Sequence, residues 1–332
     1  MSATSDTGQS WRPVVGLALG LALLVSTMLV AFGLPAVNSA PRDLPIAVVA
    51  PAGTADQMIG ALEAAQPGAF DVAVAASQEE AEAMIREREV YGAFILGADG
   101  LEVDVASAAS PTVSALLTQV GQAAAAQQGS VATVSDVVPT TEDDPRGIGL
   151  SAGALPIALG GFIAGVATTL LISGTGRRLA AIGGFAVVGG LAMTSILHFW
   201  FGTLAGSFWA TAAAATLGIL ATGLTVLGLE SLLGRPGIGV GALLVVFLGN
   251  PLSGLTSAPE MLPQPWGVIG QLLPPGATGT LLRNVAFFDG AAIAQPVLVL
   301  AGWAALGALL LGLSGLRARR VSAAEAEPVV AA

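Results

Sequence analysis

The sequence predicts a membrane protein with an all-α domain of six transmembrane helices and a small extracytoplasmic α/β domain inserted after the first helix. Six apolar segments are each about 20 residues long, which is enough to cross the roughly 30 Å hydrocarbon core of a bilayer. The more polar residues 38–148 separate the first segment from the second. The chain is 54% hydrophobic and 10% charged, whereas soluble domains carry about 25% charged residues. A chain so poor in charge needs lipid as part of its solvent.

The first expected helix covers residues 14–37 and follows a short N-terminus, residues 1–13. A cleaved signal peptide is the alternative, because "AVNSA" has small residues near a plausible cleavage point. The apolar core of about 20 residues is longer than the 7–15 residues of a signal peptide, and Asn38 fits the position three residues before cleavage poorly. We therefore favour an uncleaved anchor.

Residues 38–148 alternate between strand and helix patterns. Ser77 with Glu80 and Thr54 with Gln57 form capping boxes, which mark helix starts, and Ser110–Pro111 marks another. "LEVDVA" (residues 101–106) alternates as an edge strand would. The expected order is β-α-β-α-β-β-α-β, which predicts a small α/β domain. Its elements are strands at 44–50, 70–75, 91–96, 101–106 and 131–138, and helices at 54–66, 77–89 and 110–128.

A transmembrane domain is expected over residues 149–316. Its helices are predicted at 150–172, 179–200, 208–229, 237–255 and 295–313. Positive residues near helix ends favour the cytoplasmic side. Seven arginines lie on the same side of the membrane as the N-terminus. Three lie near helix ends on the other side, and two more on that side lie within the long domain, where the rule has little force. The seven are Arg12, Arg177, Arg178, Arg235, Arg317, Arg319 and Arg320. Both termini, including the tail 317–332, are therefore expected in the cytoplasm of a bacterial cell, with residues 38–148 outside the cell membrane.

The segment 256–294 predicts an outer re-entrant hairpin. Two short amphipathic pieces, 266–273 and 278–288, are split by Pro274–Pro275–Gly276, and each is too short to span a bilayer. Trp266 and the pair Phe287–Phe288 are expected at the depth of the lipid head groups.

Several function classes are excluded or weakened by composition. The chain has no cysteine and one histidine, His198, and lacks both the P-loop and the HExxH motif. We therefore expect no enzyme activity and no catalytic, cofactor or metal site in this chain, and assign His198 to an aromatic cluster with Phe199, Trp200 and Phe201. Residues 38–146 hold sixteen acidic residues and four arginines, which argues against nucleic-acid binding.

The interiors of the predicted helices carry almost no charge. Glu230 lies at the cytoplasmic end of its helix, where it is expected to reach water or pair with Arg235. Glycines in "GGFIAG" and "GFAVVGG" indicate close helix packing. An apolar path of this kind suits lipid-like or amphipathic cargo, or no cargo at all.

The layout resembles the ABC-2 type membrane permeases, in particular the YhgE/Pip-like branch with an extracytoplasmic domain after the first span. The resemblance rests on "LPIAVVAPAGTA", "SQEEAEAMIREREVYGAFIL" and "APEMLPQPWGVIGQLLPPGATGTLLR", the last similar to the outer hairpin of the family. It implies the permease subunit of an exporter, working as a homo- or heterodimer in membrane lipid with a cytoplasmic ABC ATPase as a separate subunit. Candidate residues follow from it for an outer gate (Trp266, Pro274, Pro275 and Arg283) and for cytoplasmic coupling (Arg177, Arg178, Glu230 and Arg235).

A second hypothesis belongs to a different class. The chain would then be a non-transporting envelope protein whose outer domain binds a partner or a phage. The sequence does not identify the cargo, the energy source or the partner.

Overall fold

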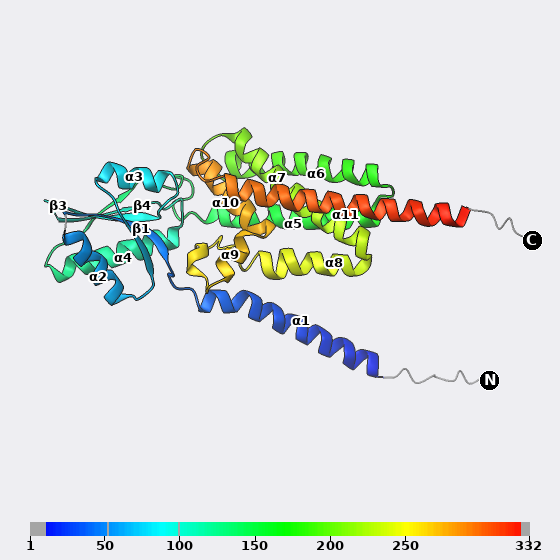
Figure 1. Cartoon of the computed structure of the whole chain (residues 1–332), viewed down its shortest axis with the longest axis horizontal. Coiled ribbons are helices and arrows are strands. Elements are labelled where there is room, and N and C mark those ends of the chain that lie inside the picture. Colours follow the sequence, from blue (N-terminus) through cyan, green and yellow to red (C-terminus); the bar gives the residue numbers. More distant parts are fainter. Residues whose placement is uncertain (1–10, 52, 99, 327–332) are drawn as a thin grey trace, which may run out of the picture.

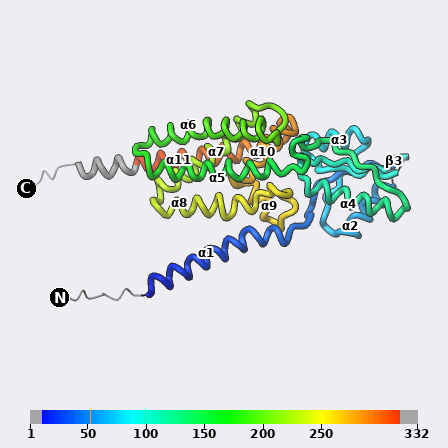
Figure 2. The backbone as a smooth tube through the Cα atoms, turned by 180° about the vertical axis from the view of Figure 1, so that it is seen from behind, coloured from blue at the N-terminus to red at the C-terminus, as the bar shows by residue number. Residues whose placement is uncertain are grey.

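The computed structural model describes residues 11–51, 53–98 and 100–326, which form a small α/β domain at one end of a bundle of long helices (Figure 1). We call the two ends of the bundle the domain end and the far end. The first described helix begins, and the last described helix ends, toward the far end (Figures 1 and 2). Residues 1–10 and the side chains from Arg317 onward lie outside the described part, so the assignments of residues 1–13 and 317–332 to the cytoplasm remain predictions.

The α/β domain has the predicted element order. Its strands are β1 (Leu44–Val49), β2 (Phe70–Val74), β3 (Gly92–Gly97), β4 (Gly100–Val105) and β5 (Thr133–Asp136). Its helices are α2 (Thr54–Ala65), α3 (Gln78–Arg86) and α4 (Pro111–Gln127). The sheet order is β2-β1-β3-β4-β5, and all neighbours are parallel except β3 and β4. Helix α3 covers one face of the sheet, and α2 and α4 cover the other (Figure 1).

Two details of the domain differ from the prediction. Strand β4 is not an edge strand, because β5 pairs with it on its outer side. Its polar residue Asp104 is fully buried, since α3 covers the face that the alternation assigned to water. Thr54 does not cap α2 either: Gly53, at φ 84°, precedes the helix, and no side chain caps it.

The other two predicted helix starts are confirmed. The Ser77 hydroxyl accepts a hydrogen bond from the Glu80 amide, and the Glu80 carboxylate accepts one from the amide of Ala76. Ser110 caps α4 by accepting from the Val113 amide, with Pro111 in the first turn. Proline is favoured there because the first turn leaves its N–H groups without helical partners.

Five helices are long and apolar enough to cross a membrane, by length and composition. They are α1 (Arg12–Val37), α5 (Ile148–Leu171), α6 (Thr175–Ser195, continued by the π-helix η1, Ile196–Trp200), α7 (Phe208–Leu233) and α11 (Ala294–Ala326). These helices make the chain a multi-pass membrane protein. Helix α7 is the centre of the bundle and packs against α5, α6 and α11, and against the shorter α8 (Arg235–Ala242) and α10 (Pro274–Phe287).

The glycine motifs serve this packing. An added Cβ at Gly161 of α5 would lie 2.7 Å from the Ile219 carbonyl oxygen of α7, and one at Gly190 of α6 would overlap Thr216 of α7. The expectation of helix packing is therefore confirmed at these two positions.

The predicted fifth span, 237–255, is shorter than expected. Its helix consists of α8 (Arg235–Ala242) and the π-helix η2 (Leu243–Gly249) and ends before Asn250–Pro251. At about 1.5 Å per residue this helix is roughly 22 Å long, which is less than the roughly 30 Å core of a bilayer. The six-helix count is therefore not confirmed.

Helix α1 stands apart from the other helices. None of its residues is buried, and it diverges from the bundle toward the far end (Figures 1 and 2). At the domain end, the residues that follow α1 are hydrogen-bonded to residues 260–261. The Ala40 amide donates to the Met261 carbonyl and the Arg42 amide donates to the Glu260 carbonyl, each at 3.0 Å.

Candidate functional site

The segment between η2 and α11 forms the predicted pair of short helices. They are α9 (Trp266–Gln271) and α10 (Pro274–Phe287), preceded by the 3₁₀ turn η3 (Pro259–Met261). The prediction that Pro274–Pro275–Gly276 separates the helices is wrong, because both prolines lie in the first turn of α10. Proline costs little there, since its missing N–H would have no helical partner.

Helix α10 is buried inside the bundle, where it packs against α5, α7 and α11. Pro274 and Pro275 are buried, and Arg283 is only 5% exposed. Trp266 is 45% exposed at the start of α9. Phe288, expected at head-group depth, is instead 4% exposed and packs with the core of the α/β domain. The hairpin thus joins the domain to the bundle.

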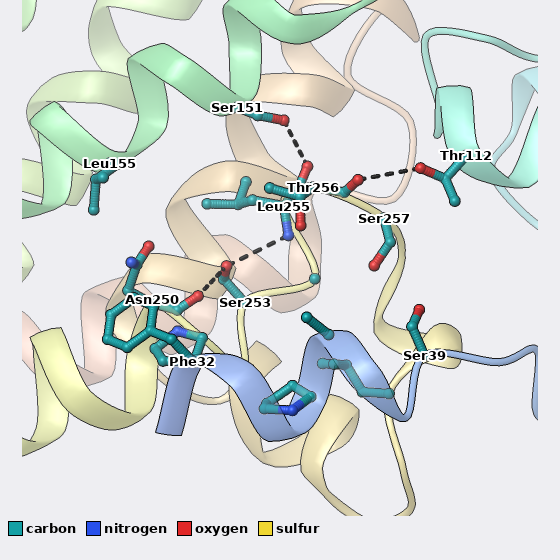
Figure 3. A pocket seen from close by; sticks show the side chains of 15 residues that line it. Phe32, Ser39, Thr112, Ser151, Leu155, Asn250, Ser253, Leu255, Thr256 and Ser257 are labelled. Atoms are coloured by element: carbon teal, nitrogen blue, oxygen red, sulfur yellow. Dashed lines mark hydrogen bonds between the residues drawn. The ribbon is translucent and has the colours of Figure 1, made fainter. Parts of the chain in front are cut away.

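A hydroxyl-lined pocket of about 420 Å³ lies at the domain end, between α1 and the bundle (Figure 3). Ser151 Oγ of α5 donates to the Leu255 carbonyl at 2.7 Å, and Thr112 Oγ1 of α4 donates to the Thr256 carbonyl at 3.2 Å. These bonds hold the segment 250–257 open as one wall of the pocket. We call this space the hydroxyl pocket.

Polar groups remain for a ligand in this pocket. Among the described residues, the side chains of Ser39, Asn250 and Ser257 line it without a hydrogen-bond partner in the protein. Phe32 and Pro35 of α1 form its apolar side. The pocket therefore offers hydroxyl and amide groups on one side and hydrocarbon on the other.

Two further cavities of about 380 Å³ each follow α1 toward the far end. Phe247 of η2 lines both of them, and Pro35 is shared between the first of them and the hydroxyl pocket. Their walls are mostly apolar and come from α1 and from α8–η2, and in the first cavity also from Leu252, Pro263 and Trp266. We call the pair the α1 groove. The groove and the hydroxyl pocket together have the shape and polarity that an amphipathic molecule requires.

The four residues expected in cytoplasmic coupling all lie at the far end of the bundle. Arg178 and Glu230 form an ion pair at 3.5 Å, and the Glu230 side chain is 21% exposed. Of the two expected alternatives, contact with water therefore holds in part, and the pairing with Arg235 is replaced by one with Arg178. Arg178 also donates to the carbonyls of Ile172 and Thr169, which would otherwise be unsatisfied at the end of α5. Arg177 and Arg235 are exposed.

Aromatic side chains gather at the junction of α6 and α7. His198 stacks edge-on against Phe199 at 4.8 Å and Phe208 at 6.0 Å between ring centroids. Trp200 is 79% exposed and Trp209 is 73% exposed. Exposed tryptophans at one level of a helical bundle are typical of a membrane–water interface.

Sequence reasoning missed the residues that meet Arg283. A second cleft at the domain end is lined by Arg88, Tyr91 and Glu260, in addition to Arg283. The Tyr91 hydroxyl donates to Glu260 Oε2 at 2.8 Å, although 169 positions separate the two residues. Burial, reinforced by the Glu260 carboxylate, raises the pKa of Tyr91, so the phenol keeps its proton. No local sequence pattern predicts this contact.

Arg283 lies outside the five membrane-length helices. Burial, together with the positive charge of Arg88, lowers its pKa to about 10, so the guanidinium stays charged at neutral pH. In the described part of the chain, no group of three or more acidic or histidine side chains could hold a metal ion.

No protein-family model, no curated protein and no solved structure matches this chain.

Proposed function

We propose that this chain is the membrane-spanning subunit of an exporter that moves an amphipathic molecule outward. It would act as a dimer with a separate cytoplasmic ATPase, and the α/β domain would lie outside the cell. The α1 groove, which ends in the hydroxyl pocket, is the observation that carries the proposal. A molecule with a polar head and an apolar chain would place its chain in the apolar groove and its head in the hydroxyl pocket. The open side of the groove would let it enter from lipid.

Two further features support the proposal. The layout and the three quoted segments resemble ABC-2 type permeases of the YhgE/Pip-like branch. The α/β domain is also bound to the hairpin, through Tyr91–Glu260 and through Phe288. A domain attached to the membrane helices favours a role in transport over the alternative, an envelope protein whose domain only captures a partner.

The residues at the far end suit a contact with the ATPase. Arg177 and Arg235 are exposed in the first turns of α6 and α8, next to the short connections α5–α6 and α7–α8. Arg178, also in the first turn of α6, donates to the carbonyl at the end of α5 and pairs with Glu230 near the end of α7, so a force applied to one connection would reach the central helix. Co-purification of a tagged chain with an ATPase is the expected result. A chain that exports in purified vesicles without any ATPase would contradict this part of the proposal.

Filling the groove tests the transport path. Surface lipids and amphiphiles of a deletion strain would be compared with those of the strain that expresses the wild-type chain, which identifies the cargo. Ala31→Trp fills the groove, whereas Ala22→Trp makes the same change at an exposed position of α1 that lines none of these cavities. We expect Ala31→Trp to reduce the surface amount of the cargo several-fold while Ala22→Trp leaves it unchanged, at equal protein abundance. Equal export by the two variants would remove the groove from the path.

A further inference from the structure

The second cleft at the domain end has no established role and shares no lining residue with the hydroxyl pocket or the α1 groove. It has a volume of about 390 Å³ and lies where the α/β domain meets η3, α9 and α10. We call it the arginine cleft, after Arg88 and Arg283.

Positive charge in this cleft is not balanced. Two guanidinium groups line it, with Glu260 as the single carboxylate among its lining residues. Glu260 accepts the Tyr91 hydroxyl, and neither arginine forms an ion pair within the described part of the chain. The formal charge of the lining is therefore +1.

Several buried polar atoms of the cleft have no partner among the described residues. Those that an anion could satisfy are the N–H donors Nε of Arg88 and Nε of Arg283. Arg283 is 5% exposed, so bulk water does not explain how its Nε is satisfied. A buried charge without a counterion is costly, because desolvation is not repaid by a hydrogen bond or ion pair.

Both guanidinium groups are held in position without being neutralised. Arg283 donates to the Leu255 carbonyl at 3.1 Å. The Arg88 guanidinium lies 5.1 Å from the ring centroid of Tyr91 and 4.8 Å from that of Phe288. Stacking on two aromatic rings orients the group and leaves its charge in place. Arg88 belongs to the α/β domain and Arg283 to α10. These two oriented guanidinium groups form a preorganised site for an oxyanion where the domain meets the bundle.

The rim of the cleft is apolar on the side of α9. Val268 is 59% exposed and Leu272 is 52% exposed, and both line the cleft. An anion with attached hydrocarbon would place its chains along these residues. The cleft has the volume of a small-molecule site.

We propose that the arginine cleft binds a singly charged oxyanion, of the kind that the phosphodiester of an anionic lipid presents, and that the lipid is its source. Guanidinium groups match the geometry of phosphate oxygens and form charge-assisted hydrogen bonds with them. The bound anion would join the α/β domain to the hairpin, because one arginine comes from each. This site does not depend on export, and a chain that transports nothing would still bind there.

The test measures the thermal stability of the purified full-length chain in an uncharged detergent. Dioctanoyl-phosphatidylglycerol, dioctanoyl-phosphatidylcholine and inorganic phosphate are titrated separately. We expect the first to raise the Tm in a saturable way and the other two to have little effect. Removing one guanidinium with Arg88→Gln should weaken phosphatidylglycerol binding roughly tenfold or more, as expected for a lost charge-assisted hydrogen bond.

Arg86→Gln is the matched control. It removes the same charge two residues away, from a side chain that is 55% exposed and paired with Glu82, and it should bind phosphatidylglycerol like the wild type. If Arg88→Gln does not fold, Arg88→Lys keeps the charge and loses the planar fork, and weaker binding by this variant at an unchanged unliganded Tm supports the site.

Three outcomes would overturn the proposal. Equal stabilisation by phosphatidylcholine would mean that the head-group charge is not recognised. Unweakened binding by the Arg88 variants would place the lipid elsewhere. A saturable effect of inorganic phosphate that Arg88→Gln abolishes would make the ligand a free anion and exclude lipid as its source.

Discussion

Buried polar groups of this chain are either fully hydrogen-bonded or left without a partner among the described residues. The Leu255 carbonyl oxygen accepts from both Ser151 Oγ and Arg283 Nη2, so one acceptor links the hydroxyl pocket to the arginine cleft. Both of its lone pairs are used, whereas one partner already satisfies the usual requirement of a buried carbonyl. Asp104 is the opposite case: it is fully buried, and neither carboxylate oxygen has a partner among the described residues.

Asp104 should make the α/β domain less stable as the pH rises. Burial, reinforced by the negative charges of Glu102 and Glu82, raises the pKa of Asp104 to about 6. The folded domain keeps this proton up to about pH 6, while the unfolded chain loses it near pH 4. The free energy of unfolding should therefore fall between pH 4 and 6, by roughly 3 kcal/mol, and stay lower above pH 6.

The variant Asp104→Asn should remove this decline. We expect its Tm to change less between pH 4.5 and pH 7 than that of the wild type, measured on the full-length chain in detergent. Asp71→Asn, on the exposed side of β2, is the control and should keep the wild-type pH dependence. A steep decline that persists in Asp104→Asn would assign it to another group.

Helices and strands were predictable from the sequence wherever a local signal marks them. Ser77, Ser110 and Pro111 mark two helix starts. The alternation of strand and helix patterns predicts the order of all the strands and helices in the domain. Hydropathy alone extends the predicted helix 237–255 to residue 255, but the helix ends before Asn250–Pro251. The edge assignment of β4 failed because the pattern shows that one face of a strand is polar, but not whether a helix covers it.

The candidate site was predictable only in part. Arg283, Trp266 and the two prolines stood out because they interrupt an apolar segment. Arg88, Tyr91 and Glu260 did not, because each is an ordinary residue of a polar segment until the fold brings it to the hairpin. Contacts across such sequence distances depend on tertiary packing and leave no periodic trace.

Close contacts between helices predict which glycines tolerate a side chain. A Cβ at Gly190 of α6 would overlap Thr216 of α7, whereas Gly184 of the same helix has no atom within 4 Å of that position. Gly190→Leu should therefore separate α6 from α7 and lower the Tm by several degrees. Gly184→Leu should leave it unchanged or raise it, because leucine favours helix more than glycine. Equal effects of the two substitutions would mean that α6 does not pack on α7 as described.

At the scale of the whole molecule, the chain divides into a domain that lies at one end and a bundle whose helices need lipid. The exposed side chains of α1 and of the outer face of α6 are almost entirely aliphatic or aromatic. The acidic residues are concentrated in the domain. We expect the arginines at the far end to set the orientation in the bilayer, with that end in the cytoplasm.

Cysteine labelling measures that orientation directly. The chain has no cysteine, so single cysteines at Gln128, in the domain, and at Thr175, at the far end, report without background. Both positions are exposed. A membrane-impermeant maleimide added to intact cells should label the cysteine at 128 and leave the one at 175 unlabelled. The reverse pattern would invert the topology and contradict outward export.

The separation of α1 from the bundle makes the protein responsive to the thickness of the membrane around it. Helix α1 has 26 residues and is about 39 Å long, whereas the hydrocarbon core measures about 30 Å. Such a mismatch is relieved by tilting. Among the described residues, the backbone hydrogen bonds that attach α1 to the hairpin lie at its domain end, so we expect α1 to tilt away from α8. Short-chain lipids would widen the angle between these helices, and long-chain lipids would narrow it.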